Sequence, residues 1–180
     1  DVKINDIAKH GFQPLWSARI TLLDCDVTGA QYLGGGGNGY AYHINASQGV
    51  LVRRCAGTDA RHNLTFQKAM CSDDVFSRFT SVKTAYNASY YQDDTHHSWA
   101  HNILFDMMNE TWVGLSAMNR GVTSTNAYET LGGGTVWNLV GDGNTTNPLA
   151  GKVQFSPETH TAESEGHVIG VTGGHRVYDG

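Results

Sequence analysis

Short apolar runs, each broken by glycine, asparagine or aspartate, recur along the chain. The clearest copy is 47–66, SQGVLVRRCAGTDARHNLTF, where an apolar run, a small-residue turn and a polar-aromatic run follow one another. Runs of four to six residues rich in Val, Ile, Leu, Phe and Thr are typical of β-strands. The repeat contains no ten-residue amphipathic stretch of the kind that a helix needs. The pattern predicts an all-β chain.

Weaker copies of this unit precede and follow it at the spacing of a solenoid coil. Cys25, Cys55, Phe79 and Met107 occupy equivalent positions, with spacings of 30, 24 and 28 residues. Units of about 20 to 50 residues that each bury one strand face must stack on their neighbours to form a core. We therefore expect a right-handed parallel β-helix of about five coils, with those four side chains in one inward column. An all-β sandwich is the alternative.

One domain is expected to hold the whole repeat. Residues 1–180 form a single β-helix in this interpretation, with an edge or incomplete coil in 1–17, regular coils in 18–141 and an irregular C-terminal coil in 142–180.

Composition and charge narrow the range of partners. The chain has 22 glycines, 3 prolines and a net charge of −5. It contains no block of lysine or arginine, so we expect no nucleic acid partner. No apolar run approaches the ~18 residues of a membrane span. The first residues carry no basic region followed by an apolar stretch, which indicates either a signal peptide already removed or an internal piece of a longer chain.

Three cysteines cannot all pair with one another. Cys25 and Cys55 stand at equivalent positions of adjacent coils, where they form either stacked free thiols in the interior or a disulfide. Cys71 is then a turn thiol or an alternative partner.

The densest group of chemistry-bearing residues is YYQDDTHHSWAH, 90–101. Carboxylates beside histidines suit both a metal site and a general acid–base pair. Strand alternation would place Asp94 and His96 on one face and Asp93 and His97 on the other, so neighbouring coils would complete any site. The candidate partners are His43, Arg61, His62 and Arg120. Exposed polar residues at solenoid turns are the alternative. We expect no metal or cofactor, unless the protein is a lyase that uses calcium.

Aromatic residues also recur at coil spacing. Tyr86, Trp112 and Trp137 are 26 and 25 residues apart. Inside the solenoid they would form an aromatic stack of the core, which their apolar neighbours favour. On an outer face they would form a platform for sugar rings, and Trp112 would then join Arg61 and His62 as a carbohydrate-binding residue.

The chain holds five N-x-[ST] sequons, where its composition gives about two by chance. They begin at Asn45, Asn63, Asn87, Asn109 and Asn144. A spacing of roughly one per coil predicts a row of N-glycans and therefore a secreted, extracellular protein. Internal asparagine ladders are the alternative.

Several of these motifs resemble the right-handed β-helix proteins of the pectate-lyase-like superfamily. The resemblance covers roughly 18–141 and rests on GYAYHINASQGVLVRRC, DARHNLTF, Asp94-Thr95-His96 with the later HNILFD, and Asn119-Arg120-Gly121. It implies polysaccharide binding, lyase or glycosidase chemistry, or a role in phage and surface fibres. Gln92-Asp93-Asp94 is similar to the paired aspartates of polygalacturonase-like glycosidases. Their Gly-His-Gly and Arg-Ile-Lys elements are missing, and so is the Arg-x-Pro-x-x-Arg of calcium-dependent lyases.

The preferred hypothesis is structural rather than enzymatic, because no complete catalytic signature is present. A solenoid has two open ends, and head-to-tail stacking of protomers would satisfy both. With a glycan on each coil, the product would be a glycosylated extracellular fibre or surface assembly.

The alternative hypothesis is a polysaccharide lyase or glycoside hydrolase, or a carbohydrate-binding fragment of one. Asp93 or Asp94 would act as the general acid and a histidine such as His96 as the base. Arg61 or Arg120 would hold the carboxylate of a uronate unit in an acidic polysaccharide.

Overall fold

The structure is a computed structural model of the 180-residue chain. It describes residues 1–33, 37–68, 70–84, 92–97, 100–111, 113–119, 131–141, 152–157, 165–172 and 176–179. Within these ranges every regular element is a β-strand. The described residues contain no helix that is long and apolar enough to cross a membrane. The all-β prediction is confirmed for this part of the chain.

The strands belong to three sheets, named A, B and C below. Sheet A contains β1 (Val2–Ile7), β4 (Cys25–Ala30), β7 (Ala56–Thr58), β10 (Thr80–Val82), β14 (Asn109–Thr111) and β17 (Val140–Gly141). Sheet B contains β2 (His10–Phe12), β5 (Tyr40–Asn45), β8 (His62–Gln67), β11 (Gln92–His97), β15 (Gly114–Asn119), β18 (Lys152–Pro157) and β20 (Arg176–Asp179). Sheet C contains β3 (Thr21–Leu23), β6 (Leu51–Arg53), β9 (Val75–Ser77), β13 (Leu104–Asp106), β16 (Leu131–Trp137), β12 (Ala100–His101) and β19 (Glu165–Ile169).

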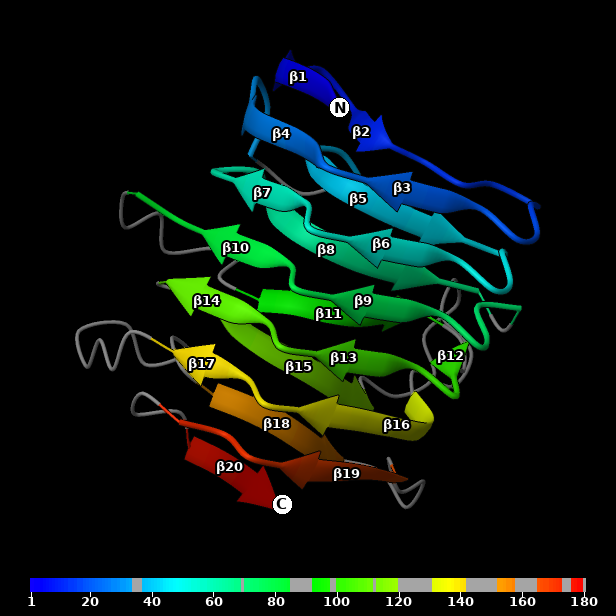
Figure 1. Ribbon diagram of the computed structural model, residues 1–180, viewed down its shortest axis with the longest axis vertical. Coiled ribbons are helices and arrows are strands. Elements are labelled where there is room, and N and C mark those ends of the chain that lie inside the picture. Colours follow the sequence, from blue (N-terminus) through cyan, green and yellow to red (C-terminus); the bar gives the residue numbers. More distant parts are fainter. Residues whose placement is uncertain are drawn as a thin grey trace.

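The chain visits the three sheets in turn, and one passage through A, B and C is called a coil below. Each strand pairs in parallel with its counterpart in the next coil, as β4 does with β7 and β5 with β8. Figure 1 shows the strands of sheets A and C in the near layer and those of sheet B behind them, with the coils stacked from the N-terminus to the C-terminus. Parallel strands in three sheets are consistent with a β-helix-like solenoid and contradict the sandwich alternative, whose sheets are antiparallel.

Sheet C turns into sheet A through a bend at a single residue with left-handed backbone. The bend residues of successive coils are Asp24, Arg54, Arg78, Met107 and Asn138, with φ between 50° and 55°. This conformation costs a non-glycine residue about 1–2 kcal/mol. At every bend the N–H of that residue donates to a carbonyl of the following coil, over 2.8 to 3.2 Å. The bend is therefore held by a repeated backbone hydrogen bond and tolerates different side chains.

The residue after each bend points into the solenoid and forms a continuous buried column. Its members are Cys25, Cys55, Phe79, Met108 and Leu139. The predicted position of Met107 is wrong by one residue. Met107 is the bend residue and is 46% exposed, whereas Met108 is 1% exposed. The spacing from Phe79 is thus 29 residues, one more than the predicted period.

Aromatic side chains fill the interior beside this column. Phe66, Phe76, Phe79 and Phe105 contact one another with ring centroids 5.3 to 6.4 Å apart, mostly edge to face. Trp137 does not belong to this core, because it is 43% exposed. The core interpretation is therefore wrong for Trp137, while Tyr86 and Trp112 lie outside the described residues.

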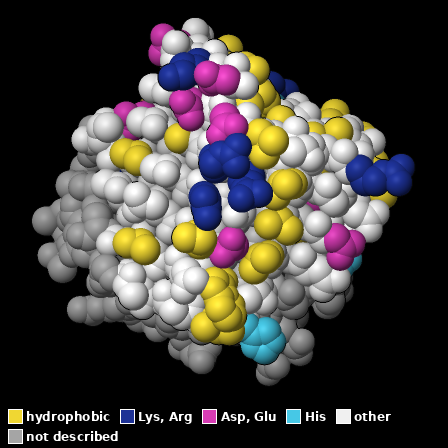
Figure 2. Space-filling model, in the orientation of Figure 1, with side chains coloured by type: hydrophobic (Ala, Val, Ile, Leu, Met, Phe, Trp, Pro, Cys, Tyr) yellow, Lys and Arg dark blue, Asp and Glu magenta, His cyan; other side chains and the backbone are white. Residues whose placement is uncertain are grey.

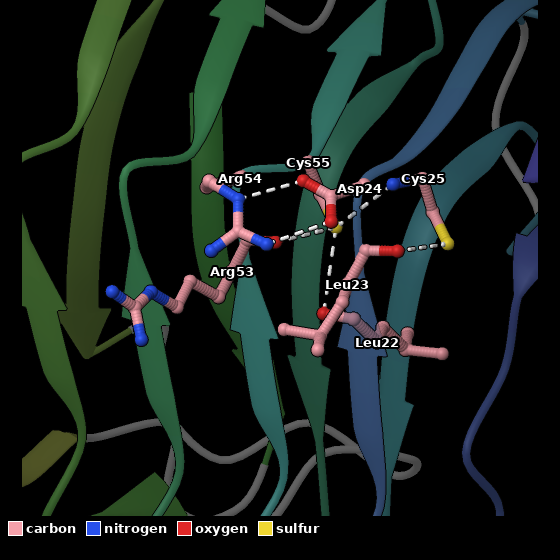
Figure 3. Close-up of polar contacts among 7 residues, drawn as sticks. All are labelled: Leu22, Leu23, Asp24, Cys25, Arg53, Arg54 and Cys55. Atoms are coloured by element: carbon pink, nitrogen blue, oxygen red, sulfur yellow. Dashed lines mark hydrogen bonds and ion pairs between the residues drawn. The ribbon is translucent and has the colours of Figure 1, made fainter. Parts of the chain in front are cut away.

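The cysteines are free thiols, so the disulfide alternative for Cys25 and Cys55 is wrong. Figure 3 shows their contacts: the Cys25 thiol donates to the carbonyl of Leu23 over 3.1 Å, and the Cys55 sulfur accepts the Cys25 N–H at 3.4 Å. Burial raises the pKa of Cys55, and it raises the pKa of Cys71 to about 11. All three side chains are stabilised here as buried, weakly polar groups.

Candidate functional site

In sheet B, strands β5 and β8 are buried on both faces. All residues of β5 and β8 are buried except the last residue of each strand. One face carries Tyr42, Ile44, Leu64 and Phe66, which belong to the hydrophobic core. The opposite, outer face carries the side chains that we call the polar cluster. They are His10, Tyr40, His43, Arg61, His62 and Asp94.

A glycine positions the two strands that contribute most to the polar cluster. Gly39 precedes β5 and has a φ of 77°. Its carbonyl accepts the N–H of Arg61 at 2.7 Å, and its N–H donates to the carbonyl of Lys9 over 2.7 Å. A Cβ at this position would overlap the carbonyl oxygen of Tyr32. Only glycine therefore allows β2, β5 and β8 to approach one another at this point.

Tyr40 and Arg61 lie at the centre of the polar cluster. Arg61 donates from Nη1 to the hydroxyl of Tyr40 over 3.0 Å, and its guanidinium carbon lies 5.4 Å from the Tyr40 ring centroid. The ring of Tyr40 also contacts the rings of His10, His43 and His62, with centroids 5.0 to 5.3 Å apart. Arg61 thus brings a permanent positive charge to a buried group of three imidazoles and one phenol.

His62 and Asp94 form a buried pair across two neighbouring coils. Nδ1 of His62 lies 3.8 Å from Oδ1 of Asp94, and both side chains are almost wholly buried. A carboxylate on one side of an imidazole orients the ring and stabilises its protonated form. The Asp94 carboxylate lies within ion-pair range of the imidazole of His62.

A network of amide side chains fixes His43 at the edge of the polar cluster. Nδ1 of His43 lies 2.8 Å from Nε2 of Gln13, and its Nε2 lies 2.7 Å from Oε1 of Gln67. Each ring nitrogen of His43 therefore has an amide side chain as a hydrogen-bond partner. Gln67 is half-buried, so the cluster reaches solvent on this side.

His10 is half-buried and lies at a second edge of the polar cluster. Its ring lies 4.5 Å from that of His43. Burial and, to a smaller extent, the charge of Lys9 lower the pKa of His10 to about 4. His10 is therefore neutral at physiological pH and contributes ring contacts to Tyr40 and His43 rather than charge.

As strand alternation predicts, Asp93 and Asp94 lie on different faces of β11. Oδ1 of Asp93 accepts the N–H of Leu64 at 2.9 Å inside the solenoid. Ser81 also hydrogen-bonds to Asp93, and the charges of Lys83, Glu110 and Asp94 act on it, so the two aspartates interact through their charges although they lie on different faces. Burial raises the pKa of Asp93 to about 7 and that of Glu110 well above its usual range. Asp93 therefore does not fit the expected role of an accessible general acid.

The polar cluster contains some predicted residues and two that the sequence did not reveal. Arg61, His62, His43 and Asp94 are brought together as expected, although Arg61 and His62 are buried. Tyr40 and His10 were missed, and the available signal was the register, which pairs Tyr40 with both His10 and His62. His96 lies in β11, but its side chain is outside the described set, as are Arg120 and Trp112.

The described sequons differ in accessibility. Asn63 is fully buried, accepts the N–H of Ala60 at 3.1 Å and donates to Ser81 Oγ over 2.9 Å. A glycan on its amide is incompatible with these bonds. Asn109 is exposed at the start of β14, and Asn45 is half-buried. Asn87 and Asn144 lie outside the described residues.

No group of three or more His, Cys, Asp or Glu in the described ranges is placed to hold a metal ion. Comparison with protein-family models, with curated proteins and with solved structures finds no match to this chain. The function is therefore argued from the polar cluster alone.

Proposed function

We propose that the chain is a polysaccharide-cleaving enzyme whose active site is the polar cluster on the outer face of sheet B. The observation that supports this proposal is the buried His62–Asp94 pair beside the Arg61–Tyr40 hydrogen bond. A base, a group that orients it, a fixed cation and a phenol in one cluster are the parts that acid–base cleavage of an acidic sugar chain needs.

The favoured reaction is β-elimination from a uronate unit. His62 takes the proton on the carbon next to the carboxylate, while Asp94 stabilises the imidazolium that forms. Arg61 pairs with the substrate carboxylate and stabilises the negative charge that develops there. The bond to the leaving sugar oxygen breaks as a carbon–carbon double bond forms, and the Tyr40 hydroxyl returns a proton to that oxygen. The proton on His62 then passes to the Tyr40 phenolate, directly or through solvent, which restores both groups before the next turnover.

The fold that accompanies this proposal is a right-handed parallel β-helix of the pectate-lyase-like kind. Parallel strand connections are right-handed in nearly all known cases, and sheets B and C each have seven paired strands. The stacked extracellular fibre stays a prediction, because it depends on contacts between chains.

The test is an assay for unsaturated products on polygalacturonate and on other uronate polymers. His62→Ala and Asp94→Asn are expected to abolish the ultraviolet absorbance of the products, and Tyr40→Phe to reduce it. His167→Ala, which removes an exposed histidine of β19, is the matched control and should leave turnover unchanged. Wild-type turnover that survives in His62→Ala would sink the proposal, as would reducing ends released without unsaturation.

A further inference from the structure

A group of arginines lies at the corner where sheet C turns into sheet A, away from the polar cluster of sheet B. Arg54 and Arg78 are the bend residues of adjacent coils, and Arg53 precedes Arg54 at the end of β6. All three side chains are exposed. Figure 2 shows Lys and Arg side chains gathered near the middle of this face, with acidic groups at their border. We call Arg53, Arg54 and Arg78 the arginine corner.

Two of the three guanidiniums are available to a ligand. Arg54 is engaged in a two-pronged pair with Asp24, with Nε and Nη2 each 2.7 Å from a carboxylate oxygen. This pair lowers the pKa of Asp24, first through the hydrogen bond and then through the charge of Arg54. Within the described residues, Arg53 and Arg78 form no ion pair with an acidic side chain. Figure 3 shows the Arg53 side chain extending away from the Asp24–Arg54 pair.

An exposed tryptophan follows the arginine corner on the same line of the solenoid. The register places Arg53 beside Ser77, Ser77 beside Asp106, and Asp106 beside Trp137. Since paired strands lie ~4.8 Å apart, Trp137 is about 14 Å from Arg53 along the axis. Asp106 lies between them, and one of its carboxylate oxygens accepts the hydroxyl of Ser77 at 2.9 Å.

We propose that the arginine corner and Trp137 bind an anionic polysaccharide that runs along the solenoid axis. A planar guanidinium fits a carboxylate or sulfate group through two parallel hydrogen bonds. An indole face offers a flat apolar surface to a sugar ring. The coil repeat of ~4.8 Å is close to the length of one sugar unit, so successive units meet successive coils. This surface holds a chain without cutting it, because no acid–base pair is built there.

The proposal shares only its ligand class with the proposed function. The arginine corner joins sheets C and A, whereas the polar cluster belongs to sheet B, so each can fail without the other. A polyanion such as DNA is a poorer fit, because the protein carries a net charge of −5 and the corner offers it only Arg53 and Arg78, the two guanidiniums with no acidic partner among the described residues.

The experiment measures binding by isothermal titration in the His62→Ala background, where turnover is absent. The probes are polygalacturonate for carboxylate, dextran sulfate for sulfate and neutral dextran as the blank. Arg53→Ala with Arg78→Ala is expected to weaken binding of a charged probe by at least tenfold and to flatten its salt dependence. Trp137→Ala should weaken it several-fold, and Asp106→Asn should strengthen it. The catalytically intact Arg53→Ala/Arg78→Ala enzyme should still cleave short oligosaccharides at the wild-type rate.

The matched control removes two positive charges elsewhere. Lys9→Ala with Arg19→Ala changes the net charge equally and removes two exposed side chains outside the arginine corner. This variant should lose far less affinity than the corner variant, because Lys9 acts on the polar cluster only through its charge on His10 and Arg19 lies outside both surfaces. Equal losses in the two double variants would show a net-charge effect and overturn the proposal. It would also be overturned if the corner variant bound normally, or if single-stranded DNA or phosphatidylserine vesicles bound the corner more tightly than either polysaccharide.

Discussion

Asp93 and Asp94 are adjacent in sequence but lie on opposite faces of sheet B. Both carboxyls are almost fully buried. Asp94 lies on the outer face beside His62, within a cluster that borders solvent at half-buried side chains. Asp93 lies in the interior, where it bonds to Leu64 and Ser81 and interacts with the charges of Lys83, Glu110 and Asp94. Burial alone therefore does not distinguish a catalytic carboxylate from a structural one; the distinction comes from what surrounds it.

The largest expected effect separates these two aspartates by activity. Asp94→Asn should lower turnover of a uronate polymer by about 10²- to 10⁴-fold, the range in which general acid–base groups contribute. Asp93→Asn should leave turnover within about threefold of wild type, because Asp93 bonds to Leu64 and Ser81 in the interior and acts on Asp94 only through its charge. Initial rates of unsaturated-product formation give both numbers, and circular dichroism confirms folding. If Asp93→Asn were the more damaging change, the catalytic face would be assigned wrongly.

The adjacent methionines provide the same inner-versus-outer contrast for packing. Met108 belongs to the buried column, so Met108→Ala should lower the free energy of unfolding by about 2–5 kcal/mol. Met107 is a half-exposed bend residue, and Met107→Ala should change that energy by less than about 0.5 kcal/mol. Urea denaturation measures both. Similar losses for the two variants would mean that the column is out of register by one residue.

The methionine pair also shows how far the sequence predicts this fold. The recurrence of short apolar runs predicts an all-β chain of stacked parallel coils, and the positions of Cys25, Cys55 and Phe79 in the column follow from it. Met107 and Met108 are chemically identical, so the pattern alone cannot decide which faces inward. That decision depends on the left-handed bend and its hydrogen bond to Trp137, which leave no mark on side-chain type.

The candidate site was predictable only in part, for a related reason. Alternation separates Asp93 from Asp94, and the A-R-H sequence draws attention to Arg61 and His62. Tyr40 joins them because β5 and β8 pair with Tyr40 beside His62. Loops of unequal length between coils set this register, so no fixed spacing in the sequence reveals it.

The buried carboxyl of Asp93, on the inner face of sheet B, should make the free energy of unfolding depend on pH. The pKa of Asp93 is raised from 3.8 to about 7 in the folded chain, so the folded state binds more protons than the unfolded state between these values. The contribution of Asp93 to the free energy of unfolding is therefore fully present below pH 3.8 and is lost towards pH 7, by as much as about 4 kcal/mol, while His10, whose pKa is lowered to about 4, contributes in the opposite direction. Asp93→Asn keeps an acceptor for the Leu64 N–H and should reduce the slope.

Urea denaturation at several pH values between 4 and 8 checks this expectation. Asp74, whose pKa burial raises to about 7, contributes in the same direction, so some slope should persist in Asp93→Asn. Asp94→Asn is not a substitute control, because it alters the outer face. A slope identical in wild type and Asp93→Asn would show that Asp93 is ionised in the folded chain throughout this range.

The smallest expected effect concerns two sequons, one buried in the interior and the other exposed on the surface. When the chain is secreted from a eukaryotic host, Asn109 should carry a glycan because it is exposed at the start of β14. Asn63 should carry none, because its amide is buried and bonded to Ser81 and to the Val82 carbonyl. Asn109→Gln should remove one glycan mass and change the free energy of unfolding by less than about 0.5 kcal/mol, since it alters only a surface side chain. Glycopeptide mass spectrometry decides the matter, and a glycan on Asn63 of the folded, secreted protein would contradict the interior position of this residue and with it the packing between sheets A and B.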